Sequence, residues 1–155
     1  MKTNLCCDVI ARLKGKMLVT AESLTGGGIG AALTSVSGSS AVYKGGVVSY
    51  TNWVKEHVLG VPAEVLMTCG AVSQQTAGYM VSGVRKLMNA DIAVSVTGLA
   101  GPAGDEFGNP VGTVFIGYED EKQKVVLHYT FSGTREEIRN QTTEEALKLI
   151  LKHNS

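Results

Sequence analysis

Hydrophobic and polar positions alternate along the chain with two different periods. Apolar residues spaced three and four apart predict helices, whereas short continuous apolar runs predict buried strands. In residues 3–15, for example, Leu5, Val9, Ile10 and Leu13 fall on one helical face. The same criteria predict helices over 3–15, 25–36, 52–60, a stretch ending near 70, 74–89 and 134–153, and strands over 17–22, 44–51, 91–98, 113–120 and 124–131.

The order of these elements predicts the fold class. Helical and extended segments alternate, which is typical of an α/β protein, and the last two strands follow one another as a hairpin. The strand at 91–98 is apolar nearly throughout and is therefore expected to be central. We expect residues 1–155 to form a single domain, a three-layer α/β/α sandwich with a mixed central sheet.

Charge and composition narrow the classes of partner. The chain has 14 basic and 14 acidic side chains, so it lacks the surplus of Lys and Arg that sequence-independent nucleic-acid binding needs. No apolar run reaches the roughly 18 residues of a membrane span. Cys6, Cys7 and Cys69 form neither a metal-binding spacing nor an even set, which predicts reduced thiols in a cytoplasmic protein. We expect a small-molecule partner, no nucleic acid and no membrane; an exposed hydrophobic face would allow a homo-oligomer.

A glycine-rich turn, "TAESLTGGGIG" at residues 20–30, joins the first predicted strand to the second helix. Gly26, Gly28 and Ala31 fit a dinucleotide-binding spacing, but the end of the next strand, "VVSYTN", has no acid to hold a ribose. A Walker A loop is also excluded, because no Lys-Ser or Lys-Thr pair follows the glycines. What remains is a helix start whose N–H groups suit a phosphate or an oxyanion.

Ser23 lies where this strand becomes the helix, a position from which a hydroxyl can project beside backbone donors. The alternative is that Ser23 or Thr25 only caps the helix. The three histidines occupy positions that favour packing or surface roles, so the candidate base is Lys55. With Asn52 as N-cap, Lys55 falls in a first helical turn, where the dipole disfavours a cation by about 0.3–1 kcal/mol. Burial would favour the neutral amine further; the alternative is a solvated surface lysine.

Six motifs occur in one order along nearly the whole chain: "TAESLTGG", "GSSAVYKGGVVSYTNWVK", "GAVS", "VSVTGLAGPAG", "NPVGTVFIG" and "FSGTREEIRNQ". In these motifs the chain resembles the C-terminal domain of the CinA (competence/damage-inducible) proteins, the nicotinamide-nucleotide amidase family. The resemblance implies an α/β/α domain that hydrolyses the carboxamide of nicotinamide mononucleotide to nicotinate mononucleotide and ammonia. It implies no metal and no redox cofactor.

The resemblance also implies roles for individual residues. Ser23 would be the nucleophile, Lys55 its base, and Tyr50 a group that relays a proton or orients the amide. Arg135 and Arg139 both match arginines where a substrate phosphate would bind, and we select Arg139. The N–H groups of the helix after Ser23 would bind the oxyanion. The residues expected to bind substrate are Thr25, Gly26, Gly27, Asn52, Gly98, Gly101 and Arg139.

The chain departs from the family pattern at three positions. Leu24 stands where family members often have cysteine, and Asp105 and Asn109 replace a glycine and a lysine in the loop "GPAGDEFGNPVG". The loss of that lysine removes a candidate phosphate contact. The alternative function is therefore a non-catalytic nucleotide-binding module in a competence or DNA-damage-related assembly. Glu22 would either orient the catalytic groups or serve as a structural acid. The activity associated with the separate N-terminal domain of CinA is not expected of this chain.

Overall fold

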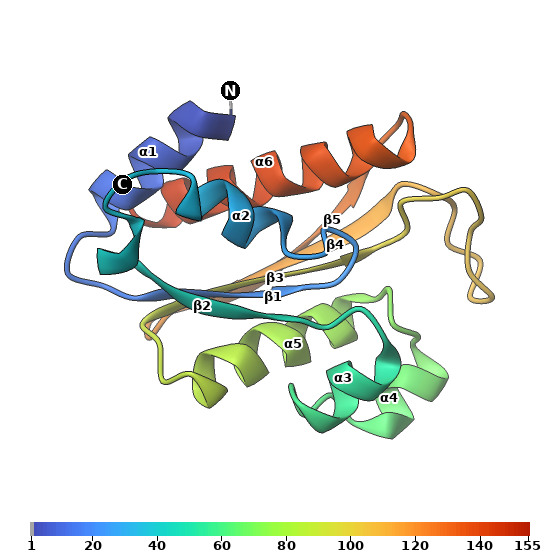
Figure 1. Cartoon of the computed structure of the whole chain (residues 1–155). Coiled ribbons are helices and arrows are strands. Elements are labelled where there is room, and N and C mark those ends of the chain that lie inside the picture. The colour runs from blue at the N-terminus through green and yellow to red at the C-terminus, as the bar shows by residue number, and fades with distance from the viewer. Residues whose placement is uncertain (1) are drawn as a thin grey trace.

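The five strands form one mixed sheet through the middle of the molecule (Figure 1). The structure is a computed structural model that describes residues 2–155. The strand order is β2-β1-β3-β4-β5; the first three strands are parallel, and β4 and β5 continue the sheet in antiparallel pairs. The strands are β1 (Leu18–Glu22), β2 (Tyr43–Val48), β3 (Ile92–Gly98), β4 (Thr113–Glu119) and β5 (Lys124–Thr130). The predicted mixed sheet and its terminal hairpin are confirmed.

Helices cover both faces of this sheet. Figure 1 shows α1, α2 and α6 on one face and α3, α4 and α5 on the other, which confirms the predicted three-layer α/β/α arrangement. Between residues 2 and 155, no helix has the length and apolar character required to cross a membrane. The helices are α1 (Lys2–Arg12), α2 (Gly28–Thr34), α3 (Asn52–His57), α4 (Ala63–Thr68), α5 (Gln74–Leu87) and α6 (Arg135–His153), with a short 3-10 turn, η1 (Ser39–Ala41).

Strand β3 is the middle strand of the sheet and contributes to both hydrophobic cores. Ile92, Val94 and Val96 pack into the core beneath α1, α2 and α6, while Ala93 packs into the core beneath α5. Successive side chains of a strand point to opposite faces, so a strand covered on both sides is apolar on both. The expectation of a central strand from its nearly continuous apolar sequence is confirmed.

The carboxyl ends of the parallel strands meet at one edge of the sheet. Because β1 pairs with β2 on one side and with β3 on the other, the chain leaves successive strands in opposite directions. Ligand sites in open α/β sheets form in the crevice at such a switch of strand order. The segments that follow β1 and β2, and the end of β3, lie together here.

Two predicted boundaries were wrong near this edge. Helix α2 begins at Gly28 instead of residue 25, because Gly26 (φ 60°) and Gly27 (φ 99°) adopt left-handed conformations that form a turn. The N-cap of α3 is Thr51 and not Asn52, which is the first helical residue. Lys55 therefore lies in the last turn of this short helix, and the expectation that a first-turn position disfavours its charge was wrong. By contrast, the helix that follows Ser73 begins where its sequence predicts, since the Ser73 side chain accepts a hydrogen bond from the Thr76 amide.

Candidate active site

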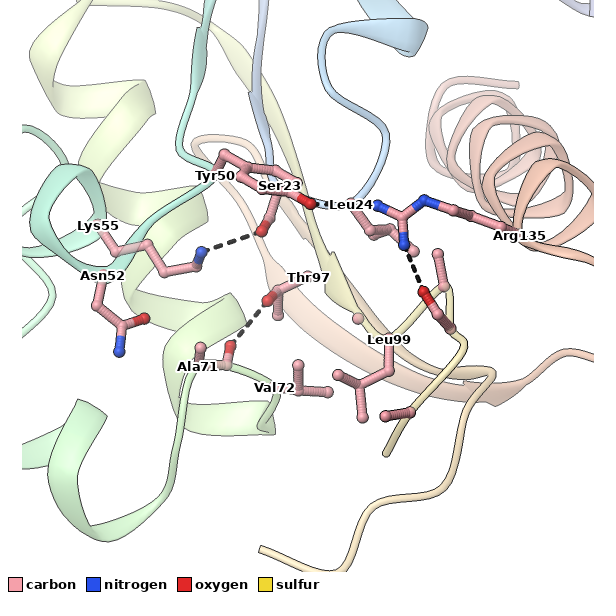
Figure 2. A pocket seen from close by; sticks show the side chains of 14 residues that line it. Ser23, Leu24, Tyr50, Asn52, Lys55, Ala71, Val72, Thr97, Leu99 and Arg135 are labelled. Carbon is pink, nitrogen blue, oxygen red and sulfur yellow. Dashed lines mark hydrogen bonds between the residues drawn. The ribbon is translucent and has the colours of Figure 1, made fainter. Parts of the chain in front are cut away.

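A buried lysine and a buried serine face each other at the carboxyl edge of the sheet. Lys55 Nζ lies 3.0 Å from Ser23 Oγ (Figure 2), although the two residues are 32 positions apart in sequence. Ser23 follows the last residue of β1, and Lys55 lies on α3. The side chains are 7% and 1% exposed, respectively. The fold therefore pairs a hydroxyl with an amine in an environment with little water.

The amine of Lys55 also donates to the carbonyl oxygen of Ser49, at 2.7 Å. Ser49 is itself fixed, because its amide and its hydroxyl both donate to the carbonyl of Glu22, the residue before Ser23. Neither of these partners carries a negative charge, so the two hydrogen bonds offset the loss of hydration only in part. Burial lowers the pKa of Lys55 from 10.5 to about 8. About a tenth of the molecules thus hold a neutral amine at pH 7.

The pair opens into a cavity of about 280 Å³. Backbone and small apolar side chains form most of its walls, with Lys55 and Asn52 on one side, Arg135 on the opposite side and Ser23 between them (Figure 2). The buried Thr97 at the end of β3 also lines the cavity, and its hydroxyl donates to the Ala71 carbonyl at 2.7 Å. This bond joins the wall formed by β3 to the wall formed by residues 71 and 72.

Arg135, from the first turn of α6, spans the mouth of the cavity. Its guanidinium donates to the Tyr50 hydroxyl at 3.1 Å and to the Gly101 carbonyl at 2.5 Å (Figure 2). Three segments far apart in sequence are joined by this one side chain. Tyr50 is 59% exposed, so its hydroxyl lies at the entrance and contacts Arg135 rather than the Ser23–Lys55 pair.

The side chain of Glu22, the last residue of β1, is bound to the amides at the start of α2. This contact bears on the expectation that those amides bind the oxyanion. One carboxylate oxygen accepts from the Thr25 hydroxyl at 2.6 Å and the Ile29 amide at 2.8 Å; the other accepts from the Thr20 hydroxyl at 3.1 Å and the Gly30 amide at 3.0 Å. The side chain is 2% exposed. The N–H groups at the start of α2 are thus directed at a carboxylate of the protein. The prediction that the helix N–H groups bind the oxyanion is therefore wrong for the Ile29 and Gly30 amides, which Glu22 already occupies.

The cavity brings together six of the residues singled out from the sequence, and the others lie elsewhere. Thr25 and Arg139 line a neighbouring cleft that shares Arg135 with the cavity, and Gly27 lines a third depression beside Val48. Gly26 lies next to the Arg139 guanidinium. The residues that line the cavity are Ser23, Tyr50, Asn52, Lys55, Gly98 and Gly101. Substrate binding by the remaining residues stays a prediction.

Sequence reasoning missed two polar contributors, Ser49 and Thr97. Thr97 could have been found, because it is the last polar side chain of a central apolar strand and directly precedes the glycines of the irregular loop. Ser49 acts through its backbone carbonyl, for which a sequence carries no signal. Arg135 and Arg139 both match arginines of the family pattern, and only the structure shows that Arg135 is the one that faces the cavity.

The histidines pack against aromatic rings away from the cavity. His57 stacks on Trp53, His128 on Phe115 and His153 on Tyr118, with ring centroids 4.4–4.7 Å apart. Within residues 2–155, no group of three or more acidic, histidine or cysteine side chains is arranged to hold a metal ion. Lys55 is therefore the basic side chain that the described structure offers to Ser23.

Comparisons with known proteins place this geometry in a family context. Residues 3–153 match the CinA C-terminal domain. A CinA-like protein of Endomicrobium trichonymphae is 45% identical over 95% of the chain and 37% of its own length, and a competence-damage inducible protein of Bacillus anthracis is 47% identical over 88% of the chain and 33% of its own. The chain thus spans about a third of the length of these relatives.

Solved structures are similar over the whole chain. The crystal structure of the competence/damage inducible protein CihA from Agrobacterium tumefaciens matches with a TM-score of 0.96 and 40% identity, covering 99% of this chain and 96% of that one. A CinA superfamily protein from Enterobacter cloacae also matches with a TM-score of 0.96, at 30% identity, covering 100% of this chain and 93% of that one.

Proposed function

Because the chain belongs to the CinA C-terminal domain family, we propose that it hydrolyses the carboxamide of nicotinamide mononucleotide to nicotinate mononucleotide and ammonia. The observation that carries this proposal is the buried contact between Lys55 Nζ and Ser23 Oγ. A nucleophilic serine needs a neighbouring group that can take its proton, and a desolvated lysine meets this requirement near neutral pH. The reaction would belong to pyridine-nucleotide salvage.

The first half of the reaction forms an ester on Ser23. Ser23 Oγ attacks the carbonyl carbon of the carboxamide while Lys55 Nζ takes the hydroxyl proton. The Ser49 carbonyl accepts one N–H of the amine, which directs the nitrogen lone pair toward Ser23. The tetrahedral intermediate then breaks its C–N bond, and Lys55 returns the proton to the departing nitrogen as ammonia leaves. General acid–base catalysis of this kind contributes about 10²–10⁴-fold.

The second half removes the acyl group. A water molecule attacks the ester carbon, Lys55 takes the water proton, and the breaking C–O bond returns Ser23 Oγ, which recovers a proton from Lys55. The products are nicotinate mononucleotide and the free enzyme. The bonds made and the protons moved in these steps involve Ser23, Lys55, water and the substrate, and the same amine acts first as base and then as acid.

The size of the cavity suggests which part of the substrate lies inside it and which part lies at its mouth. A volume of about 280 Å³ is slightly below that of most small-molecule sites, which run from about 300 to 1,000 Å³. The pyridine ring with its carboxamide would fill the cavity, and the ribose phosphate would lie at the mouth beside Arg135. We accordingly transfer the proposed phosphate contact from Arg139 to Arg135, whose guanidinium can bind a phosphate in a bidentate manner.

Ammonia release from nicotinamide mononucleotide tests the proposal directly. We expect turnover by the wild type and none by Ser23→Ala, whose fold should persist because the lost hydroxyl makes a single contact with another side chain. The matched control is Ser40→Ala, on an exposed serine of η1. Substrate binding without ammonia release by the wild type would instead support a non-catalytic nucleotide-binding module in a competence or DNA-damage-related assembly.

A truncated substrate tests the proposed contact with the phosphate. Free nicotinamide should be a much poorer substrate than its mononucleotide, because binding energy from the remote phosphate helps to position the amide. Arg135→Met should raise KM for the mononucleotide and leave the constants for nicotinamide nearly unchanged. Equal effects on both substrates would exclude Arg135 as the phosphate contact.

A further inference from the structure

Arg139 reaches from α6 to the turn that carries the nucleophile. Its Nε donates to the Leu24 carbonyl at 2.9 Å and its Nη2 to the Thr25 carbonyl at 3.1 Å. The guanidinium also lies against Gly26, where an added Cβ would be 3.4 Å from Nη2. Arg139 does not line the cavity that holds Ser23 and Lys55. Arg139 therefore contacts the nucleophile turn, residues 23–27, from the side opposite the cavity.

These two bonds fix the planes of the peptide groups on either side of Thr25. In a trans peptide group the N–H and C=O point in opposite directions. Since the Leu24 carbonyl points toward Arg139, the Thr25 amide in the same peptide group points away from α6. The Ser23 carbonyl likewise accepts from the Gly26 amide at 3.1 Å, which directs the Leu24 amide away from that bond.

Three amides of this turn, those of Leu24, Thr25 and Gly27, have no acceptor in the protein within residues 2–155, whereas the Ser23, Gly26 and Gly28 amides are bound to backbone carbonyls. Gly27 lines a separate depression beside Val48, which leaves the Leu24 and Thr25 amides, next to Ser23 in sequence, as the candidate donors. The amide after a nucleophilic serine often helps to bind the oxyanion in hydrolases. Glu22 already holds the amides at the start of α2, so a developing negative charge must find its donors elsewhere.

We propose that Arg139 is a positioning residue that orients the nucleophile turn so that the Leu24 and Thr25 amides bind the oxyanion. This inference rests on the proposed amidase function for the identity of the reaction. It assigns Arg139 no contact with the substrate. A guanidinium suits this task because its planar, permanently charged fork can hold two carbonyls at once, which an ammonium group does less well.

A comparison of two substrates distinguishes a positioning role of Arg139 from a role in binding phosphate. Arg139→Ala and Arg139→Lys should lower kcat by a similar factor for nicotinamide mononucleotide and for nicotinamide riboside, which has no phosphate, with little change in KM. Loss of an oxyanion donor costs about 10²–10³-fold in kcat, so we expect about 10–100-fold for donors that are loosened but present. A loss confined to the mononucleotide and expressed in KM would overturn the proposal, because it would show that Arg139 binds phosphate.

Covalent labelling of Ser23 supplies a readout that needs no substrate. Ser23 Oγ attacks the phosphorus of a fluorophosphonate, Lys55 takes the hydroxyl proton, a P–O bond forms and fluoride leaves. The phosphonyl oxygen gains negative charge in the transition state and would be bound by the same donors as the oxyanion of the amide reaction. We expect slower labelling, measured by intact-protein mass spectrometry, in both Arg139 variants. Labelling at the wild-type rate would refute the role of Arg139, whereas labelling of a wild type without amidase activity would refute only the proposed function.

The matched control is Arg85→Lys. The Arg85 side chain on α5 also donates to a backbone carbonyl, that of Asp91 at 3.2 Å, and pairs with Glu119 far from the cavity. This variant should retain the wild-type labelling rate. Thermal unfolding of every variant identifies any that lose the fold, and if Arg139→Ala does so, the folded Arg139→Lys variant decides the outcome.

Discussion

Lys55 Nζ and Ser23 Oγ form a hydrogen bond of 3.0 Å inside the protein, with the Ser49 carbonyl as the second partner of the amine. No carboxylate takes part in this arrangement. Burial therefore favours the neutral amine of Lys55, and this amine can accept the proton of the Ser23 hydroxyl. The pair combines the two properties that a serine nucleophile requires, proximity and a base of suitable pKa.

The pH dependence of catalysis should report the ionisation of Lys55. Because only the neutral amine can accept the serine proton, kcat/KM should rise with pH along a single ionisation near pH 8. Lys55→Met should abolish that rise together with most of the rate, and Lys55→Arg should not restore it, since a guanidinium stays protonated. Steady-state kinetics between pH 6 and 10 would measure this.

The control for this experiment is Lys44→Met, at an exposed position of β2. It removes a positive charge and should leave the profile unchanged. Near-normal activity of Lys55→Met would mean that the base lies elsewhere, with Tyr50 as the next candidate.

Stability should depend on pH through the same lysine. A folded-state pKa of about 8 against an ordinary 10.5 means that the unfolded chain binds this proton more tightly. The penalty, on the order of 3 kcal/mol, is fully present below about pH 8 and is relieved as the pH rises toward 10.5. Lys55→Met should therefore raise the free energy of unfolding at pH 7, by about 1–2 kcal/mol after the loss of two hydrogen bonds. The gain should shrink by pH 10 in urea titrations; a gain that is constant with pH would contradict this explanation.

The two loop residues that depart from the family pattern hold one wall of the cavity. Asn109 Nδ2 donates to Asp105 at 2.9 Å and to the Val72 carbonyl at 3.2 Å, and Val72 lines the cavity. Asn109→Ala should raise KM for the mononucleotide about 3- to 10-fold with kcat maintained, the scale of one or two lost hydrogen bonds. Asn109→Asp should raise KM further, because it places a second carboxylate beside Asp105. Steady-state kinetics would show this, with Glu106→Gln in the same loop as control; unchanged KM in both Asn109 variants would disprove the link.

Two glycines of α5 should respond in opposite ways to alanine. An added Cβ at Gly83 would lie 2.0 Å from the Leu59 carbonyl oxygen, whereas at Gly78 it would meet the Lys124 and Val126 side chains at ordinary van der Waals distances of 3.6–3.8 Å. Gly83→Ala should lower the free energy of unfolding by about 1–3 kcal/mol, and Gly78→Ala should raise it by about 0.5–1 kcal/mol. Leu59 belongs to the segment that follows α3, so Gly83→Ala should also disturb Lys55 and reduce activity. Urea unfolding of both variants would measure the contrast; equal stabilities would contradict the packing described.

Local pattern alone determined most of the secondary structure and the layer arrangement. Helix α6 could be predicted because Thr134 and Glu137 form a capping box before a periodic apolar stripe, and β3 because its apolar run marks a strand covered on both faces. Such features depend on residues close in sequence and on burial, which the hydrophobic pattern reports. The identities of Ser23 and Lys55 as candidates also came from the sequence, through their motifs.

Only the tertiary structure decided how these candidates are arranged. The parallel pairing of β1 with β2 places the segment after β2, which carries Lys55, beside the end of β1, where Ser23 lies. The burial that lowers the pKa of Lys55 comes from several elements packed around it. The tertiary structure also gives different surroundings to two arginines that are four residues apart on α6. Arg135 faces the cavity, while Arg139 faces the carbonyls behind Ser23. Residues at that spacing share a helical face, so no local pattern distinguishes them; what surrounds each one is set by segments 34 to 115 positions away in sequence.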